Sequence, residues 1–242
     1  MAEFAFSTTG KPAPVHLELL GLQGERVAEV EADMEVIVEE AFTRYPAFRP
    51  EPEPHRLAEA ARLLAGAERP MIVAGGGTVT SEAGPEIVKL AEALSIPVAT
   101  SLNAKEIIAA NHPLAVGVVG TYSRWCANQA VAEADLVMFV GSHTGDQVTD
   151  VWTVPRPGTP TIQIDIDPAE LGRSYPATVP MVGDAKATLR RLLEKLAQSP
   201  PRSEWPERTR QVGRRAAPSP SLLSEGREPD GGLCAIWISG QS

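Results

Sequence analysis

The sequence predicts an α/β fold in which a parallel sheet is flanked by helices, over roughly residues 55 to 197. Short apolar runs alternate along this stretch with longer segments that carry apolar residues at helical spacing. Several of the short runs are apolar at consecutive positions, which is typical of strands buried on both faces of a parallel sheet. A cluster of glycines follows the first run directly. Together these features indicate a Rossmann-like domain with right-handed crossovers.

Strands and helices are expected in regular alternation within this domain. The strands are expected at residues 71–74, 97–100, 136–140 and 161–166. Apolar residues at helical spacing indicate helices around residues 57–64 and 87–94, and further helices are expected at 124–134 and 185–196. Ser81 and Asp184 are the expected N-caps of the second and the last of these helices, because their side-chain oxygens can accept from free helix amides.

The regions on either side of this domain have a different texture. Residues 14–19 alternate apolar and polar side chains, as a half-buried strand does, and prolines between residues 46 and 54 indicate a linker. After residue 198, prolines and arginines interrupt any periodicity, so we expect a flexible or incomplete tail. The sequence therefore predicts three parts: residues 1–50, the Rossmann-like domain at 51–198, and the tail at 199–242.

The composition restricts the classes of protein to which the chain can belong. Its 242 residues carry a net charge of −9, which argues against a broad surface for nucleic acid or for an anionic membrane. The two cysteines, Cys126 and Cys234, have no metal-binding spacing and fit a reducing cytoplasm. No apolar run approaches the roughly 20 residues of a membrane helix, and the first residues do not resemble a signal peptide. These features predict a cytoplasmic protein with no nucleic-acid or membrane partner.

The glycine cluster at residues 75–77 allows two interpretations. Glycines after a strand let a phosphate approach the amides of a helix N-terminus, and they also form tight turns that bind nothing. The fingerprint of a dinucleotide site is incomplete here, because Thr80 stands at the third glycine position. Thr100 and Ser101 also stand where a ribose-binding acidic residue is expected, so an ordinary NAD site is not expected.

Polar residues gather where the predicted strands end, which is the edge at which parallel sheets bind ligands. Asp165 and Asp167 are placed to accept from ribose hydroxyls, although Asp167 is equally suited to cap the short helix that begins at Pro168. We expect cofactor-binding residues among the strand ends, loops and helix starts of this edge, and we expect no catalytic or metal-binding residue. The candidates are Gly75, Gly76, Gly77, Thr100, Asn103, Gly120, Thr121, Asp146, Asp165, Asp167, Gly183 and Asp184.

Eight short stretches occur in an order and spacing that resemble the acetolactate-synthase-like family of thiamine-diphosphate-dependent enzymes. These stretches lie at residues 10–19, 69–77, 94–98, 112–114, 120–122, 134–136, 164–168 and 183–185. The first, GKPAPVHLEL, resembles the end of the family's pyrimidine-binding domain, and RPMIVAGGG at 69–77 resembles the opening strand of its central domain. The resemblance implies a central domain preceded by a piece of the upstream domain.

The resemblance also implies the cofactors and the assembly of the whole enzyme. The family's enzymes hold thiamine diphosphate and Mg²⁺ in two outer domains, some of their central domains bind FAD, and the active site forms between two subunits. A homo-oligomer, or partner chains that carry the outer domains, is therefore expected. The implied activity is carboligation or decarboxylation of 2-oxo acids.

The chain departs from the family pattern at the positions that would perform this chemistry. The family's activating glutamate would precede residue 1, and its Gly-Asp-Gly metal motif is absent after the central domain. The FAD-binding relatives carry two arginines in the loop after the third predicted strand, and this chain has His143 and Gln147 there. Arginine binds phosphate with a planar fork that neither residue replaces.

Three functions remain open from the sequence. The first is a central domain that is inactive alone and depends on partner chains for thiamine diphosphate and magnesium. The second is a stand-alone module that binds FAD or ADP, although the lost arginines argue against FAD. The third is a truncated remnant without function.

Overall fold

The computed structural model describes residues 8–16, 39–123, 125–202 and 204–215. The chain forms two compact units, Met1–Arg49 and Pro50–Ser242. In the first unit, the short helix η2 (Glu40–Phe42) brings the ring of Phe42 edge-on to that of Phe48, with ring centroids 5.8 Å apart. Of the strand predicted at 14–19, residues 14–16 have no regular structure and residues 17–19 lie outside the described part.

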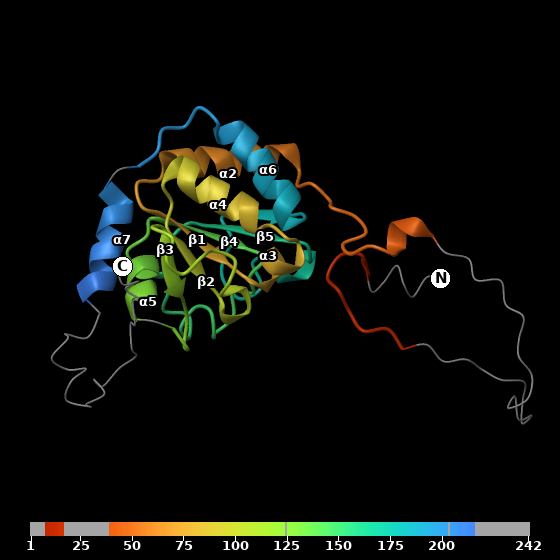
Figure 1. The fold of residues 1–242 in the computed structure, drawn as a ribbon, viewed down its shortest axis with the longest axis horizontal. Helices are drawn as coiled ribbons and strands as arrows, with labels where there is room; N and C mark the ends of the chain where they lie inside the picture. The colour runs from red at the N-terminus through yellow and green to blue at the C-terminus, as the bar shows by residue number, and fades with distance from the viewer. Residues whose placement is uncertain (1–7, 17–38, 124, 203, 216–242) are drawn as a thin grey trace, which may run out of the picture. The chain divides into compact units, whose positions relative to one another are not determined.

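The second unit is built on a sheet of six strands that are all parallel, which confirms the predicted fold class. The strands lie in the order β3-β2-β1-β4-β5-β6, shown in Figure 1. They are β1 (Pro70–Ala74), β2 (Val98–Thr100), β3 (Ala115–Val118), β4 (Leu136–Val140), β5 (Thr161–Asp165) and β6 (Val179–Val182). Strands β3 and β6 were not predicted from the sequence. Both are short edge strands, and they contain Gly117 and Pro180, residues that weaken a strand pattern.

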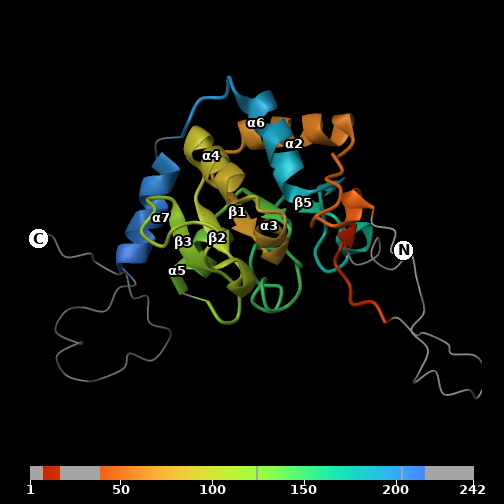
Figure 2. The same cartoon turned by 45° about the vertical axis from the view of Figure 1, so that its right-hand side comes forward.

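Helices cover both faces of the sheet, as Figures 1 and 2 show. One face packs against α2 (Pro54–Gly66), α4 (Gly84–Leu94) and α6 (Ala185–Leu196), and the other against α5 (Trp125–Ala132) and α7 (Glu204–Arg215). Three short helices follow strands: α3 (Gly76–Thr80) after β1, η3 (Leu102–Ala104) after β2, and η4 (Pro168–Glu170) after β5. None of the described helices combines the length and the apolarity that a membrane span requires.

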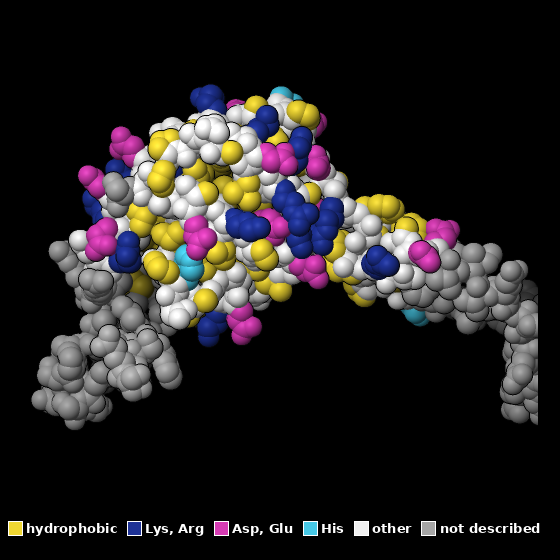
Figure 3. All heavy atoms as spheres, turned by 45° about the horizontal axis from the view of Figure 1, so that its top comes forward, with side chains coloured by type: hydrophobic (Ala, Val, Ile, Leu, Met, Phe, Trp, Pro, Cys, Tyr) yellow, Lys and Arg dark blue, Asp and Glu magenta, His cyan; other side chains and the backbone are white. Residues whose placement is uncertain are grey.

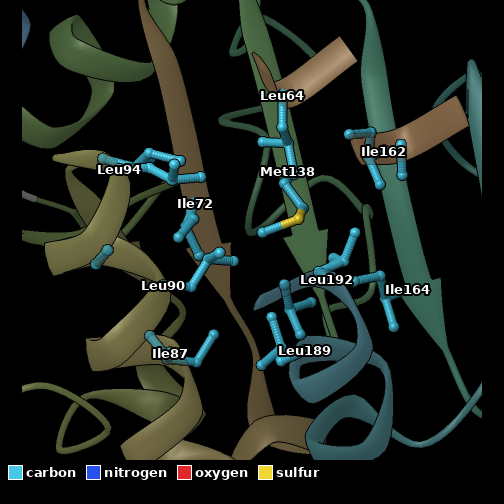
Figure 4. Close-up of a cluster of buried hydrophobic side chains, with 14 of the residues drawn as sticks. Leu64, Ile72, Ile87, Leu90, Leu94, Met138, Ile162, Ile164, Leu189 and Leu192 are labelled. Atoms are coloured by element: carbon cyan, nitrogen blue, oxygen red, sulfur yellow. The ribbon is translucent and has the colours of Figure 1, made fainter. Parts of the chain in front are cut away.

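The core is largest between the sheet and the three-helix layer. Along β1, Ile72 and Ala74 enter this core, while Met71 and Val73 enter the smaller core under α5 and α7. This alternation follows from the two-residue period of a strand. Figure 4 shows the helix side chains over those of the strands; the labelled residues are Leu64, Ile72, Ile87, Leu90, Leu94, Met138, Ile162, Ile164, Leu189 and Leu192.

The outer surface of the three-helix layer is covered by paired charges. In Figure 3, in which this layer is turned toward the viewer, basic and acidic side chains lie side by side. Lys186 and Arg190 of α6 pair with Glu82 and Glu86, at 3.7 and 2.9 Å. Glu86 is buried, so its pairing with Arg190 offsets part of the cost of removing a carboxylate from water and adds to the packing beneath it.

Regular structure continues past residue 198 in the described part of the chain, as helix α7. Helix α7 packs against α5, and its Trp205 is buried. The Trp205 indole N–H donates to the Pro70 carbonyl at the start of β1, at 2.8 Å. Arg208 pairs with Glu133 at 2.9 Å. Pro206 concealed the helix in the sequence, but a proline within the first helical turn removes no internal hydrogen bond.

Arg202 ties this C-terminal segment to the ends of two helices. Its guanidinium donates to the carbonyls of Ala67 and Leu94, at 2.9 and 3.0 Å, and also to that of Leu64. These carbonyls lie at the C-termini of α2 and α4, where they lack partners within the helix and where a cation is favoured. Burial lowers the pKa of the Arg202 guanidinium, and the nearby Asp135 carboxylate opposes that shift.

We expect Arg202→Ala to lower the free energy of unfolding by roughly 1.5–3 kcal/mol, the contribution of hydrogen bonds from a charged donor. The free energy of unfolding of Arg202→Lys should lie between those of Arg202→Ala and the wild type. One ammonium cannot reach both helix ends as a guanidinium fork does. Urea denaturation measures both values. Arg210→Ala is the control, since Arg210 makes an exposed pair with Glu207. An equal loss for the two alanine variants would contradict this role of Arg202.

Candidate functional site

Every candidate residue lies at the carboxyl edge of the sheet. Gly75, Gly76 and Gly77 follow β1, Thr100 ends β2 with Asn103 just beyond it, and Gly120 and Thr121 follow β3. Asp146 lies in the loop after β4, Asp165 ends β5, Asp167 precedes η4, and Gly183 and Asp184 follow β6. Because all six strands are parallel, these positions share one edge. Neighbouring candidates form three groups along it, and Asp184 joins α3 to α6 beside them.

The first group lies where β1 meets β4, the point at which the strand order reverses and where such sheets bind ligands. Here the Gly75 amide donates to the Val140 carbonyl and the Gly77 amide to the Gly141 carbonyl, both at 2.9 Å. A Cβ atom at Gly75 would lie 2.3 Å from the Gly141 oxygen. The backbones of the two loops are therefore in direct contact, and two amides of the turn are committed to protein carbonyls.

Gly141 completes this contact with a left-handed backbone. Its φ is +53°, and a Cβ there would lie 2.8 Å from the backbone of Gly77. Its amide donates to the Ile164 carbonyl of β5 at 2.8 Å. On the other side of β1, Gly76 packs against Asn103, whose Cβ would lie 3.3 Å from a Cβ at Gly76. The glycines thus bring together the loops that follow β2, β1 and β4, and Gly141 bonds to the end of β5.

The second group joins the loops after β3 and β4. The Thr121 amide donates to the Gln147 carbonyl at 2.9 Å, and the Asp146 carboxylate accepts from the Gln147 amide at 2.9 Å. Asn128 of α5 accepts from the Gly120 amide at 2.8 Å and donates to the Asp150 carboxylate at 3.2 Å. The Asp146 carboxylate therefore orders its own turn.

The third group surrounds the end of β5. Asp165 is buried, and its carboxylate accepts from the Asp167 amide at 3.0 Å. Burial raises the pKa of the Asp165 carboxyl group, and the hydrogen bond from the Asp167 amide opposes this shift. Glu170, also buried, pairs with Arg173 at 2.9 Å and lies 3.9 Å from His143. Asp167 caps η4 by accepting from the Ala169 amide at 2.9 Å, so its capping interpretation is confirmed.

Asp184 has a structural task, because both of its carboxylate oxygens accept hydrogen bonds within the protein. One accepts from the Ala187 amide at 2.9 Å, which confirms the predicted N-cap of α6, and the other accepts from the Ser81 hydroxyl at 2.6 Å. The predicted N-cap role of Ser81 is wrong. Ser81 ends α3, and the left-handed backbone of Glu82 (φ 53°) intervenes before α4 begins at Gly84.

Three buried hydroxyls at this edge have no hydrogen-bond partner among the described residues. They belong to Ser101, after β2, to Thr144, after β4, and to Thr188 in α6, which lies beside Gly183. Within the described ranges, no group of three or more His, Cys, Asp or Glu side chains is arranged to hold a metal ion. The edge thus offers single polar groups and closely packed glycines.

Sequence reasoning missed several residues that shape this edge, notably Asn128, Gly141 and Glu170. A signal existed for two of them. Asn128 is one of two polar residues in a mostly apolar helix, and Gly141 directly follows a buried strand, as Gly75 does. Glu170 has no such signal, because acidic residues at helix starts are usually exposed.

This fold, with a glycine turn at the point of strand reversal, defines an α/β domain of the dinucleotide-binding type. Residues 57–192 match the family described as "Thiamine pyrophosphate enzyme, central domain". The chain therefore belongs to the thiamine pyrophosphate enzymes and contains their central domain.

Its relatives are considerably longer proteins. The chain is 41% identical over 197 residues to a probable acetolactate synthase large subunit of Methanocaldococcus jannaschii, an alignment that covers 81% of this chain and 33% of that protein. It is 32% identical over 197 residues to an acetolactate synthase of Mycobacterium bovis, covering 80% of this chain and 30% of that protein. With the large subunit of Corynebacterium glutamicum, the identity is 33% over 208 residues, covering 84% and 32%. The chain spans about a third of the length of the relatives it matches.

We expect Gly141→Ala to destabilise the chain by roughly 2–5 kcal/mol, since it combines a left-handed backbone with a backbone clash. Gly145→Ala is the matched control, because a Cβ at Gly145 meets no atom within 4 Å. Urea denaturation of both variants gives the comparison. If the two variants lost the same stability, the close contact between the loops after β1 and β4 would be contradicted.

Asp165→Asn should stabilise the chain at neutral pH. Because folding raises the pKa of Asp165, the folded chain holds this proton more tightly than the unfolded chain does. That contribution is full below the ordinary pKa of 3.8 and is lost as the pH rises through the folded-state pKa. Asparagine carries no buried charge and still accepts from the Asp167 amide.

Thermal melts between pH 4 and pH 8 test this expectation. The advantage of Asp165→Asn over the wild type should grow as the pH rises and then level off. Asp146→Asn, which alters an exposed carboxylate, controls for the general effect of net charge. An advantage for Asp165→Asn that did not depend on pH would refute the argument.

Proposed function

We propose that this chain serves as the central domain of a thiamine-diphosphate-dependent enzyme that decarboxylates 2-oxo acids or joins them, as acetolactate synthases do. Catalysis belongs to its assembly with further domains, in a homo-oligomer or with partner chains, in the cytoplasm. Thiamine diphosphate, when bound in such an assembly, supplies the electron sink for the carbanion left by departing carbon dioxide. The observation that carries the proposal lies at the carboxyl edge between β1 and β4. There the Gly75 and Gly77 amides already donate to protein carbonyls.

At that edge, a ligand would have to displace protein hydrogen bonds. A phosphate cradle requires free amides that point toward the ligand. Here the Gly75 and Gly77 amides donate to Val140 and Gly141, and the Thr78 amide donates to the Gly75 carbonyl. The glycines thus support a packing role for the turn. A domain whose task is to position other domains requires such packing and needs no ligand at this turn.

The described residues also do not fit Mg²⁺ with thiamine diphosphate. Magnesium prefers octahedral oxygen ligands and is usually held by carboxylates together with phosphates. The carboxylates of this edge are committed elsewhere: Asp167 and Asp184 cap helices, and Glu170 pairs with Arg173. This supports placing the cofactor on other domains.

FAD fits poorly for a related reason. The loop from Gly141 to Val154 contains no arginine or lysine, so it offers no side chain for bidentate contact with a diphosphate. Its His143 lies near Glu170, and its Asp146 orders the turn to Gln147. The proposed function therefore includes no bound flavin.

A stand-alone module that binds an adenine nucleotide is the second candidate. The unpartnered hydroxyls of Ser101 and Thr144 favour it, because buried polar groups are normally hydrogen-bonded and a ligand could supply the missing partner. A ligand screen separates the two candidates.

Thermal melts of the full chain with Mg-thiamine diphosphate, FAD or ADP should show no stabilisation. A ligand that binds only the folded state, at 100 times its dissociation constant, adds about 2.7 kcal/mol, which is easily measured. Stabilisation by FAD or ADP that Thr144→Val removes would establish the nucleotide-binding module instead.

The same chain should form acetolactate from pyruvate when it is mixed with the segments that flank the aligned region of the M. jannaschii relative, with Mg-thiamine diphosphate present. The chain alone and the segments alone are the controls, and neither should form product. Product from the chain alone, or no product from the mixture, would overturn the proposed function.

A further inference from the structure

Four large apolar side chains are exposed on one part of the carboxyl edge. They are Tyr122 (67% exposed), Trp125 (57%), Val151 (60%) and Trp152 (49%), and we call them the aromatic patch. Single exposed apolar residues are common, but a cluster that includes two tryptophans and a tyrosine is typical of protein interfaces.

Hydrogen bonds through Asn128 link the segments that carry the residues of the aromatic patch. Asn128 bonds to Gly120, two residues before Tyr122, and to Asp150, which directly precedes Val151 and Trp152. Trp125 lies one helical turn before Asn128 on the same face of α5. The residues of the patch therefore lie on α5 and on the two loops that Asn128 joins to it.

The loop after β4 holds Val151 and Trp152 in a backbone conformation that side chains disfavour. Asp150, Val151 and Trp152 have φ values of 47°, 54° and 58°, and a left-handed conformation costs roughly 1–2 kcal/mol for each residue that is not glycine. The Val151 amide donates to the Asp146 carbonyl at 2.8 Å, and the Trp152 amide to the Thr149 hydroxyl at 3.1 Å. These bonds fix two exposed apolar side chains in place before any partner arrives.

The described chain also leads toward this part of the edge. Trp205, at the start of α7, bonds to Pro70 at the amino end of β1, and Arg208 pairs with Glu133, just after α5. Helix α7 therefore runs antiparallel to α5, from the amino edge of the sheet toward the carboxyl edge. It ends at Arg215, on the side of the sheet where α5 and Trp125 begin.

We propose that the aromatic patch is the docking surface for another domain of the same enzyme, drawn from the two thirds of its relatives' length that this chain does not match. The inference rests on the proposed function. The partner surface is apolar at its centre, to match the patch. It carries lysine or arginine at its rim, because Asp146 and Asp150 border the patch and the whole chain has a net charge of −9.

Sedimentation velocity of the full chain, with the flanking segments of the M. jannaschii relative as the probe, tests this surface. The wild type should form a complex, and Trp125→Ser/Trp152→Ser should weaken it by at least tenfold. Val182→Ser is the matched control, since Val182 is an exposed apolar residue at the end of β6, far along the sheet order from β3. Its affinity should equal that of the wild type.

A second variant guards against misfolding of the double variant. Val151→Asn places a residue that tolerates a left-handed backbone at Val151 and removes an apolar side chain, so it should melt like the wild type and still weaken the complex. Equal affinity of Val151→Asn and wild type would overturn the docking surface. A wild-type dimer that Val151→Asn dissociates would also overturn it, in favour of a second copy of the chain as occupant.

Acetolactate formation separates this inference from the proposed function. Product formation at the same rate with the wild type and with the patch variants, at limiting concentrations, would overturn the docking surface. That result would leave the proposed function supported. If the wild-type mixture forms neither complex nor product, the proposed function itself is overturned.

Discussion

The contact of two backbones at Gly75, Gly77 and Gly141 is the constraint on which the rest of the carboxyl edge depends. Without Cβ atoms at these positions, the Gly77 amide reaches the Gly141 carbonyl, and Gly141 reaches the Ile164 carbonyl of β5. Three strand ends are thereby fixed to one another, and the loop after β4 starts in a defined direction. In dinucleotide-binding domains, a glycine turn at this position lets a phosphate come close to the backbone. In this chain the turn lets another loop's backbone come close instead, so the fold alone does not decide the function.

The other polar anchors of the domain also fix separate elements to one another, because each of them joins two or three elements of the fold. Asp184 accepts from Ser81 and from the first turn of α6, so α3 and α6 share one carboxylate. Arg202 joins the C-termini of α2 and α4. Asn128 joins α5 to the loops after β3 and β4. Such buried or half-buried groups are costly unless they are bonded, and their bonds set the positions of the surface elements. The aromatic patch is the surface that results at one end of the edge.

The sequence was sufficient to predict the fold because the buried strands and amphipathic helices carry strong apolar patterns. The strands β1, β2, β4 and β5 and the helices around Leu64, Leu90 and Leu189 are all of this kind. It was insufficient where an element is short or is defined by distant partners. Strand β6 contains a proline, and α7 depends on Trp205 reaching Pro70. Among the candidate site residues, the sequence placed all twelve near the ligand-binding edge. It predicted the bond from the Ala187 amide to Asp184, but it could not indicate the bond from Ser81 to Asp184 or those of the Gly75 and Gly77 amides, because these partners lie tens of residues away in the chain.

Amide hydrogen exchange at Gly75 and Gly77, followed by NMR with and without ADP, tests the central claim most directly. If these amides donate to Val140 and Gly141, they should exchange slowly in the free chain, and saturating ADP should leave their rates unchanged. Gly158, an exposed glycine in the loop between β4 and β5, provides the reference. Fast exchange at Gly75 and Gly77 that slows when ADP is added would contradict the account, because it would show a turn whose amides are held free for a phosphate.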